Sequence, residues 1–598
     1  MTTITSHITG LPAVELGDHE HLTSTLWERA RSQPSAVKLR YPRGGAWEDL
    51  TWGALAQRVR ELAAGLVEAG VGVGDRVALM SATRVEWTIA DMAVLAAGAV
   101  TVPIFETSSQ EQCAWILSDA GVTLAIAGSA DAGKTLDAAR VEAPSVSEVL
   151  VIDDGGLDAL AERATDAGRQ AVDERLAGLR SHDLASIIYT SGTTGNPKGC
   201  VLTHRNLLGT ARGAIRVLPE LFSEQDATLL FLPLAHVFAR IIQIGSLESP
   251  IMLGYARGME HLREDLAALR PTFVLGVPRV LEKIYHGAQR KAGGGLKGAI
   301  FARAAAVGQR WSQSERPGLL LGLQRGLYDR LVYSKLREAM GGQVAYCVSG
   351  GAPLAPHIAH FFNAAGIVIL EGYGLTETSA ASVANPASRN IIGTVGVPIA
   401  GFEAGIAGDG EVLLRGVGVF RGYWQNDDAT RMALGEEGWF HTGDMGEVTA
   451  AGHLRITGRK KELIVTAAGK NVAPAVLEER LKAHALVSQA MVVGDGRPFV
   501  GALLTLDRDE LEAFAAEHGL ASADPAQVGE DPLVRAELQQ AVDHANAAVS
   551  RAESIRRFEV LPRDFSEPDG ELTPTLKLKR PVVSRTFADA IERIYHQG

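Results

Sequence analysis

The sequence predicts an α/β protein with a large N-terminal domain of helix-covered sheets and a small α+β C-terminal domain. Helical segments and apolar strand segments alternate through much of the chain, which is typical of sheets covered by helices on both faces. With 598 residues the chain is too long for one hydrophobic core. Near Gly458 the alternation gives way to a different texture, which indicates a second domain of roughly the last 140 residues.

Alternating helices and strands begin early in the chain. Leu55, Val59, Leu62 and Leu66 recur at helical spacing up to Gly70. The apolar segment that follows, 76–80, predicts a strand. The pattern returns as a helix over 86–97 and as apolar strand segments at 100–104, 149–153, 184–188, 228–233, 272–276, 345–349 and 367–371.

Three polar, glycine-bearing loops follow strands of this series. They are 190–199, 349–353 and 372–377. Ligands of parallel α/β sheets bind beyond the carboxyl ends of strands. We therefore expect the three loops to form one rim of a ligand site.

Other segments follow different patterns. Residues 287–342 are rich in Ala, Arg, Leu and Gly at helical spacing, which predicts a helical insertion that serves packing. In the last part of the chain, Pro474 starts an amphipathic helix that extends to about Leu481. A hairpin of 491–493 with 500–506 and helices at 510–518 and 534–549 complete the expected small domain.

Composition excludes several classes of protein. A formal charge of −12 and the lack of any run of four basic residues argue against a nucleic-acid partner. Cys113, Cys200 and Cys347 are too few and too far apart for a disulfide framework or a zinc ribbon. No signal-peptide pattern and no apolar run of about 18 residues occurs, so we expect a cytoplasmic protein. A peripheral contact at the inner membrane face stays open.

The loop after the apolar run 184–188 has the composition of a polyphosphate site. Its glycines let the backbone approach an anion, its hydroxyls donate hydrogen bonds, and Lys198 adds positive charge. It differs from the common P-loop because Pro197 precedes the lysine and Gly199 follows it. Such a loop is equally typical of a surface turn, so its interpretation depends on the rest of the chain.

Five motifs occur in a fixed order, and together they resemble those of the adenylate-forming superfamily. This superfamily includes acyl-CoA synthetases, luciferases and the adenylation domains of peptide synthetases. The resemblance extends from about Leu26 to Val583 and is most similar to the long-chain fatty acyl-CoA synthetases. The motifs are Tyr189-Thr-Ser-Gly-Thr-Thr-Gly-Asn-Pro-Lys-Gly199, Tyr373-Gly-Leu-Thr-Glu377, Gly438-Trp-Phe-His-Thr-Gly-Asp444, Gly458-Arg-Lys-Lys-Glu-Leu-Ile464 and Gly570-Glu-Leu-Thr-Pro-Thr-Leu-Lys577.

The resemblance implies a first reaction in which a carboxylate attacks the α-phosphorus of ATP. Fixed cations and oriented donors must offset the repulsion of two anions. Lys577, Glu377 and Thr190 are the implied catalytic residues, and the last two would hold Mg²⁺. A small misalignment of the last motif would replace Lys577 with Lys579. The implied ATP-binding residues are Thr190, Ser191, Gly192, Thr193, Thr194, Gly195, Lys198, Gly351, Ala352, Pro353, Tyr373, Gly374, Thr376, Asp444, Arg459 and Lys577, with Asp444 and Arg459 at the ribose.

The second implied reaction is attack of the coenzyme A thiol on the acyl-adenylate. By resemblance, a mobile small domain (462–598) rotates against the large domain (1–457) about a hinge at 458–461. Lys461 is the hinge residue, and Gly469 lies on the face that coenzyme A approaches. The alternative interpretation is that Lys461 is an exposed charged residue of a linker without a role in rotation.

The acyl substrate is implied by a segment similar to that of long-chain synthetases, in which His236 and Phe238 line the acyl pocket. The alternative interpretation of His236 is a structural histidine near the end of a strand, with its hydrogen bonds satisfied by the protein. The implied function is ATP-dependent activation of a long-chain fatty acid to acyl-AMP and then to acyl-CoA. The alternatives are an acyl-AMP ligase that delivers the acyl group to a carrier protein, and a non-catalytic regulator that binds acyl-CoA or nucleotide. Chain length, oligomeric state and regulation are not predicted.

Overall fold

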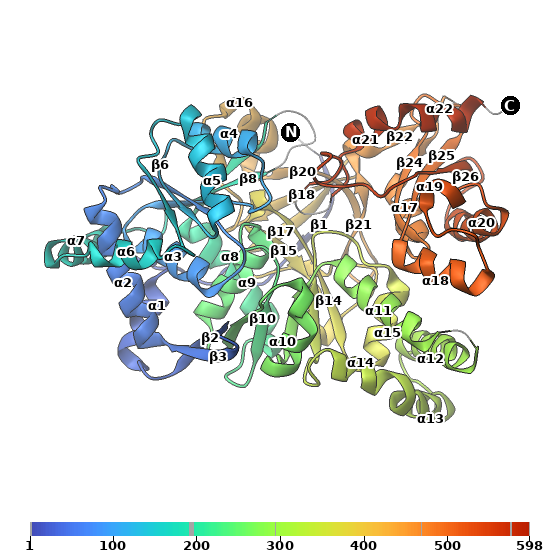
Figure 1. The fold of residues 1–598 in the computed structure, drawn as a ribbon, viewed down its shortest axis with the longest axis horizontal. Helices are drawn as coiled ribbons and strands as arrows, with labels where there is room; N and C mark the ends of the chain where they lie inside the picture. The colour runs from blue at the N-terminus through green and yellow to red at the C-terminus, as the bar shows by residue number, and fades with distance from the viewer. Residues whose placement is uncertain (1–2, 191–195, 294, 468, 574–576, 597–598) are drawn as a thin grey trace.

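The computed structural model describes residues 3–190, 196–293, 295–467, 469–573 and 577–596. Three sheets build the large part of the molecule, and the segment from Ile464 onward forms two small sheets with helices beside them (Figure 1). The fold is mixed α/β with a large N-terminal and a smaller C-terminal domain, as the sequence predicts. Among the described residues, no helix combines the length and apolar character needed to cross a bilayer.

A seven-stranded sheet confirms the first helix–strand alternation. Its strands lie in the order β19-β9-β8-β5-β4-β6-β7. The five strands from β8 to β7 are parallel, whereas β9 and β19 each pair antiparallel with their neighbours. The bounds are β4 (Arg76–Met80), β5 (Val100–Ile104), β6 (Val122–Ala127), β7 (Glu148–Val151), β8 (Leu184–Thr190), β9 (Lys198–Thr203) and β19 (Gly422–Tyr423).

A nine-stranded sheet has the order β16-β15-β14-β13-β12-β10-β11-β2-β3. Its centre, from β2 to β14, is parallel, and both edges are antiparallel. The alternation of helices and strands predicts parallel pairing, and the structure shows antiparallel pairs in addition at the edges of these sheets. The bounds are β2 (Val37–Arg43), β3 (Ala46–Thr51), β10 (Ala227–Leu230), β11 (Met252–Tyr255), β12 (Phe273–Gly276), β13 (Tyr346–Ser349), β14 (Val368–Leu375), β15 (Ala380–Ala384) and β16 (Val397–Pro398).

A third, five-stranded sheet is antiparallel throughout and has the order β1-β17-β18-β20-β21. Its first strand comes from the start of the chain and pairs with a strand some 400 residues later. The alternation of helices and strands did not predict this sheet. The bounds are β1 (Ile4–Thr9), β17 (Phe402–Ala407), β18 (Glu411–Gly416), β20 (Phe440–Val448) and β21 (Leu454–Arg459).

The segment 278–339 is helical, which confirms the predicted helical insertion. It contains α11 (Pro278–Ala292), α12 (Gly295–Gln313), α13 (Leu319–Tyr328) and α14 (Ser334–Ala339). The other helices of the large domain are α1 (Ser24–Ser32), α2 (Trp52–Glu68), α3 (Val85–Ala96), α4 (Gln110–Ala120), α5 (Ala130–Ala139), α6 (Gly156–Glu162), α7 (Asp166–Gly178), α8 (His204–Val217), α9 (Val237–Glu248), α10 (Leu262–Leu269), α15 (Pro356–Ala364) and α16 (Asp427–Ala433).

The C-terminal part has its own hydrophobic cores. Among the described residues, its buried apolar side chains, from Ile464 to Ile594, cluster only with one another. This separation is what two independently packed domains require. The bounds are β22 (Ile464–Val465), β23 (Asn471–Val472), α17 (Pro474–Lys482), β24 (Val487–Val493), β25 (Val500–Leu506), α18 (Arg508–His518), α19 (Pro525–Val528), α20 (Pro532–Asn546), β26 (Ile555–Val560), α21 (Arg580–Thr586) and α22 (Ala588–His596).

Candidate active site

The structure places the predicted loops at the ends of strands from two different sheets. β8 of the seven-stranded sheet ends at Thr190, and β13 and β14 of the nine-stranded sheet lead to Gly351 and Glu377. Ser191, Gly192, Thr193, Thr194 and Gly195 lie outside the described residues. Gly351 has a φ of +84° at the end of β13, and Ala352 and Pro353 beside it are exposed.

Asp444 lies at the centre of a hydrogen-bonded group of predicted residues. The Tyr373 hydroxyl donates to Asp444 Oδ2 at 2.6 Å, and Arg459 Nε lies 3.2 Å from Asp444 Oδ1. The pairing of β20 with β21 sets Arg459 directly opposite Asp444. Burial and the neighbouring Asp444 charge raise the pKa of Tyr373, so this phenol stays protonated as a donor. These two contacts fix the orientation of the Asp444 carboxylate, which is what the predicted hydrogen bonds to two ribose hydroxyls would require.

Gly374 and Thr376 follow Tyr373 along β14. A Cβ at Gly374 would lie 1.6 Å from the carbonyl oxygen of Ala380, so only glycine allows the close approach of β14 to β15. The strand pairing is irregular at this point, between Tyr373 and Gly374. Thr376 opens the short helical turn that carries Glu377. The bulge therefore turns the chain from Tyr373 toward Glu377.

Glu377 and the predicted phosphate loop approach one another through Tyr423. The Tyr423 hydroxyl donates to Glu377 Oε1 at 2.8 Å, and Lys198 Nζ lies 5.3 Å from the centre of the Tyr423 ring. Thr190 Oγ1 donates to the Lys198 carbonyl at 3.4 Å across the β8–β9 pair. Glu377, Thr190 and Lys198 all act on the buried Cys200 thiol, whose pKa is raised mainly by burial. Glu377, Thr190 and Lys198 are therefore near enough to Cys200 to affect its ionisation.

Tyr423 is a residue that sequence reasoning missed. It lies in β19, a two-residue strand that pairs with β9 far away in the sequence. Its phenol stays protonated because burial and the Glu377 charge raise its pKa. An aromatic residue in so short a strand gives no local signal. Only the pairing of β19 with β9 reveals its place.

Lys577 faces this group from the C-terminal domain. Burial and the nearby Arg459 guanidinium lower its pKa, while Asp444, Glu377 and Glu462 act in the opposite direction. Lys577 is nevertheless exposed at the protein surface. The predicted lysine, ribose clamp and metal carboxylate therefore interact electrostatically in this structure. The segment 574–576 before Lys577 lies outside the described residues.

His236 and Phe238 form the start of α9. His236 caps this helix by accepting a hydrogen bond from the Phe238 backbone N–H at 3.1 Å. Burial and the Lys577 charge lower its pKa to about 4, so the imidazole is neutral at physiological pH. Its ring packs edge-on against Phe105, with the centroids 6.4 Å apart. His236 thus has a structural role as a helix cap and also lies near Lys577.

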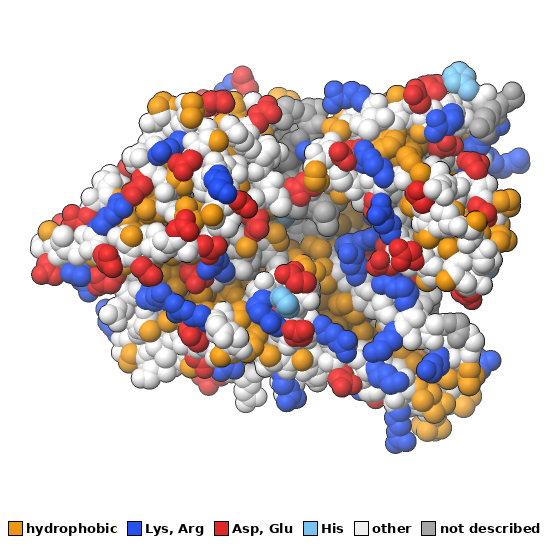
Figure 2. All heavy atoms as spheres, viewed as in Figure 1, with side chains coloured by type: hydrophobic (Ala, Val, Ile, Leu, Met, Phe, Trp, Pro, Cys, Tyr) orange, Lys and Arg blue, Asp and Glu red, His pale blue; other side chains and the backbone are white. Residues whose placement is uncertain are grey.

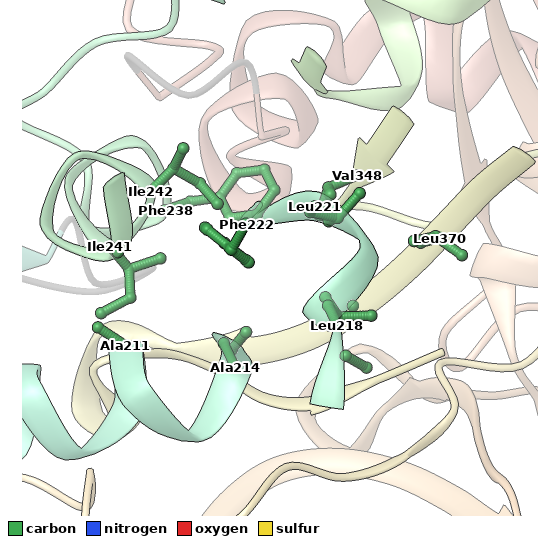
Figure 3. A pocket seen from close by; sticks show the side chains of 14 residues that line it. Ala211, Ala214, Leu218, Leu221, Phe222, Phe238, Ile241, Ile242, Val348 and Leu370 are labelled. Atoms are coloured by element: carbon green, nitrogen blue, oxygen red, sulfur yellow. The ribbon is translucent and has the colours of Figure 1, made fainter. Parts of the chain in front are cut away.

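Phe238 lines an apolar cavity of about 40 Å³, and His236 does not (Figure 3). This volume counts only the space open to the centre of a water molecule, of which one water needs roughly 10–15 Å³. The cavity therefore holds about three waters. A long acyl chain therefore requires the lining side chains to move. Phe238 lies against the turn after β13, since a Cβ on Gly350 would be 2.9 Å from Phe238 Cζ. The lining residues are Ala211, Ala214, Leu218, Leu221, Phe222, Phe238, Ile241, Ile242, Gly245, Val348, Leu370, Gly372, Ala381 and Ala384.

Lys461 lies between two residues that are tied to different domains. Before it, Lys460 Nζ contacts Asp409 Oδ2 at 2.6 Å and Glu411 Oε2 at 3.0 Å in the large domain. After it, Glu462 Oε2 lies 3.5 Å from Arg580 Nε in the small domain. Lys461 itself is exposed. The connection between the domains is thus anchored on each side of this residue.

Gly469 lies in the turn that joins β22 to β23. It is exposed, its φ is +76°, and a Cβ there would meet no atom within 4 Å. The glycine is therefore required by backbone conformation and not by close packing in this arrangement.

Comparison with known proteins gives consistent results. The model of the "AMP-binding enzyme" family matches residues 26–424, and that of the "AMP-binding enzyme C-terminal domain" matches residues 461–598. The chain is 47% identical over 590 residues to the long-chain-fatty-acid–CoA ligase FadD15 of Mycobacterium tuberculosis, covering 97% of this chain and 98% of that protein. It is 32% identical to the peroxisomal long chain acyl-CoA synthetase 6 of Arabidopsis thaliana, covering 92% and 82%.

Solved structures share the fold at low identity. The anthranilate CoA ligase AuaEII in complex with anthranoyl-AMP has a TM-score of 0.70 at 19% identity, covering 96% of this chain and 98% of that one. A Mycobacterium tuberculosis fatty acyl CoA synthetase has a TM-score of 0.63 at 22% identity, covering 95% and 98%.

Proposed function

The chain belongs to the family of AMP-binding enzymes, and from this premise we propose that it is a long-chain fatty acid–CoA ligase. It activates the acid with ATP to an acyl-adenylate and then transfers the acyl group to coenzyme A, with release of pyrophosphate and AMP. One observation carries this proposal to the residues of the chain. Gly372 lines the apolar cavity, the next residue Tyr373 holds Asp444, and Glu377 follows in the turn after the same strand. The charges of both carboxylates act on the pKa of Lys577 from the C-terminal domain.

In the first step, we assign the ribose hydroxyls of ATP to Asp444, which Tyr373 and Arg459 hold in place. The phosphates lie along the loop that ends at Lys198. The Lys577 ammonium bridges the entering carboxylate and the α-phosphate. At about 4 Å and an effective dielectric of about 20, one such charge pair contributes about 4 kcal/mol, enough to change a rate by orders of magnitude when it forms in the transition state.

The residues present fit a magnesium ion. The Tyr423 hydroxyl donates to Oε1 of Glu377, and Oε2 has no hydrogen-bond partner among the described residues. Glu377 and the Thr190 hydroxyl both act on the Cys200 thiol. A carboxylate and a hydroxyl oxygen suit this hard cation, which binds substrate phosphates and keeps several waters. Glu377 and Thr190 would hold the ion, which supplies neutralisation of phosphate charge. Tyr423 would orient the carboxylate by occupying its other oxygen.

In the second step, the small domain rotates about Lys461, which withdraws Lys577 and brings the Gly469 turn to the acyl-adenylate. The anchoring of Lys460 and Glu462 to different domains supports this position of the hinge. Free thiols titrate near pH ~8.5, so attack by the coenzyme A thiolate needs modest assistance.

Labelled pyrophosphate exchange into ATP tests the first step, with acids from acetate to long-chain fatty acids as substrates. We expect exchange that depends on a long-chain acid, and an acyl-CoA product when coenzyme A is added. Absence of exchange with every acid would overturn the proposal. Exchange without thioester formation would instead favour an acyl-AMP ligase that serves a carrier protein.

A further inference from the structure

The helix α13 exposes a row of leucines that no described part of the chain covers. Leu319, Leu320, Leu323 and Leu327 expose 91%, 71%, 74% and 57% of their surface, and Leu331, one turn further on, exposes 43%. Their spacing of three and four residues places them along one side of the helical segment. We call these five residues the leucine face. Exposed apolar patches of this kind mark interaction surfaces.

The leucine face is fixed outward because the other side of α13 is attached to the protein. The Arg325 guanidinium lies 4.3 Å from the centre of the Trp311 ring, and its Nε donates to the Ala364 carbonyl at 2.9 Å. Beyond the helix, the buried Tyr333 hydroxyl donates to the Ala304 carbonyl at 2.7 Å. The helix therefore cannot roll to bury its leucines without losing these contacts.

The surroundings of the leucine face are basic in an acidic protein. The segment 287–342 carries ten lysines and arginines against three acidic residues, whereas the whole chain has a formal charge of −12. Lys297, Arg316, Arg330 and Lys335 are exposed and form no ion pair with any described residue. Figure 2 shows hydrophobic side chains at the lower right, where Figure 1 places α13, with basic side chains beside them.

We propose that α13 docks on the surface of a lipid bilayer that contains anionic lipids. The leucine face enters the boundary between headgroups and acyl chains, and the cations beside it contact lipid phosphates, as in amphipathic helices that lie in a membrane interface. Charge complementarity favours this occupant. A second copy of the chain placed symmetrically on the same face would bring two basic surfaces together.

The docking goes beyond the proposed function and does not depend on it. Docking would bring a ligase of long-chain acids to the membrane, into which such acids partition. Binding to the membrane requires neither ATP nor turnover. A failure of the docking would therefore leave the ligase proposal intact, and the reverse is equally true.

Co-sedimentation of the full chain with vesicles tests the proposal. We expect binding to vesicles of phosphatidylcholine with phosphatidylglycerol, and weaker binding to phosphatidylcholine alone or at high salt. Leu323→Gln with Leu327→Gln should lower the partition coefficient by roughly tenfold or more, because two leucines lose their burial. Arg316→Gln with Arg330→Gln should lower it on the anionic vesicles only.

The matched control is Val141→Gln with Met432→Gln, two residues that expose 81% and 82% of their surface on other elements. This variant should bind vesicles like the parent chain. Far-UV circular dichroism and the thermal unfolding midpoint show whether each variant is folded like the parent chain. If the leucine variant binds as well as the parent, the proposal is wrong. It is also wrong if the parent chain does not bind vesicles and light scattering shows that the parent is a dimer whereas the leucine variant is a monomer.

Discussion

Lys577 is the residue on which the proposed adenylation step most depends. Burial and the Arg459 charge lower the pKa of Lys577, which means that its charged form is less stable than in water. An anionic substrate beside it would stabilise that charged form. Asp444 and Glu377 act in the opposite sense, and the carboxylate and phosphates of the substrates would add to them. The ammonium is thus placed where negative charge is expected to accumulate in the reaction.

Lys577→Ala should abolish acyl-adenylate formation, with a loss of orders of magnitude in pyrophosphate exchange, because the bridging charge is gone. The variant should still convert a supplied acyl-adenylate to acyl-CoA, since the small domain has then rotated the lysine away. Lys579→Ala is the control and should leave exchange nearly unchanged. Equal loss of both half-reactions in Lys577→Ala would contradict a role confined to the first.

Gly350 sets how closely Phe238 lies to the turn after β13. Gly350→Ala adds a methyl group 2.9 Å from Phe238 Cζ, so the ring must move, and the apolar cavity changes shape. We expect kcat/KM to fall several-fold for long-chain acids and less for short ones, measured as AMP release over a chain-length panel. Gly322→Ala, at a helical position with free space around it, is the control. A uniform loss across chain lengths would argue against a role of this contact in specificity.

At the residue scale, sequence reasoning could identify groups that a motif carries but not the groups that hold them. Asp444 and Arg459 were predicted together at the ribose, but their support by Tyr373 was not predicted, and the structure joins the three because β20 pairs with β21 and the β14–β15 pairing is irregular at Gly374. Tyr423 gave no signal, since its contact with Glu377 depends on pairing between segments more than 200 residues apart.

At the scale of elements, the buried parallel strands were predictable and the antiparallel sheet was not. The strands at 76–80 and 100–104 match β4 and β5, because each is an apolar run that follows a helix and a glycine-bearing turn. The five-stranded sheet joins Ile4–Thr9 to Phe402–Ala407, a pairing that no local pattern contains. Three loops were expected to converge on one rim, and two of them, which follow strands of different sheets, do approach one another through Tyr423.

The connection at Lys461 belongs to this scale because its role is mechanical. Lys461→Pro removes a backbone N–H and fixes φ, so it should restrict rotation between the anchored Lys460 and Glu462. Adenylation should stay largely intact, and thioester formation from supplied acyl-adenylate should fall by at least an order of magnitude. Lys461→Ala removes only the side chain and should be close to the parent in both steps. Normal thioester turnover in the proline variant would exclude rotation at this residue.

At the scale of the whole molecule, the two domains meet at a set of charges that the sequence did not indicate. Arg290 Nη1 on α11 lies 2.5 Å from Glu510 Oε1 on α18, and Arg279 Nη2 lies 3.4 Å from Asp507 Oδ2 and 3.2 Å from Ser488 Oγ. These contacts belong to the arrangement in which Lys577 interacts with Asp444 and Glu377. They would be broken by the proposed rotation, so they favour the adenylating arrangement.

Arg279→Gln with Arg290→Gln should therefore slow adenylation without blocking it. Partly exposed ion pairs contribute about 0–1 kcal/mol each, so losing two should lower pyrophosphate exchange by up to about thirtyfold, and high salt should reduce the parent toward the variant. Thioester formation from supplied acyl-adenylate should be unchanged or faster, because less free energy opposes rotation. Arg303→Gln, an exposed residue of α12 without an ion pair to any described residue, is the matched control. Equal slowing of both half-reactions would mean that α11 stabilises the fold rather than one arrangement of the domains.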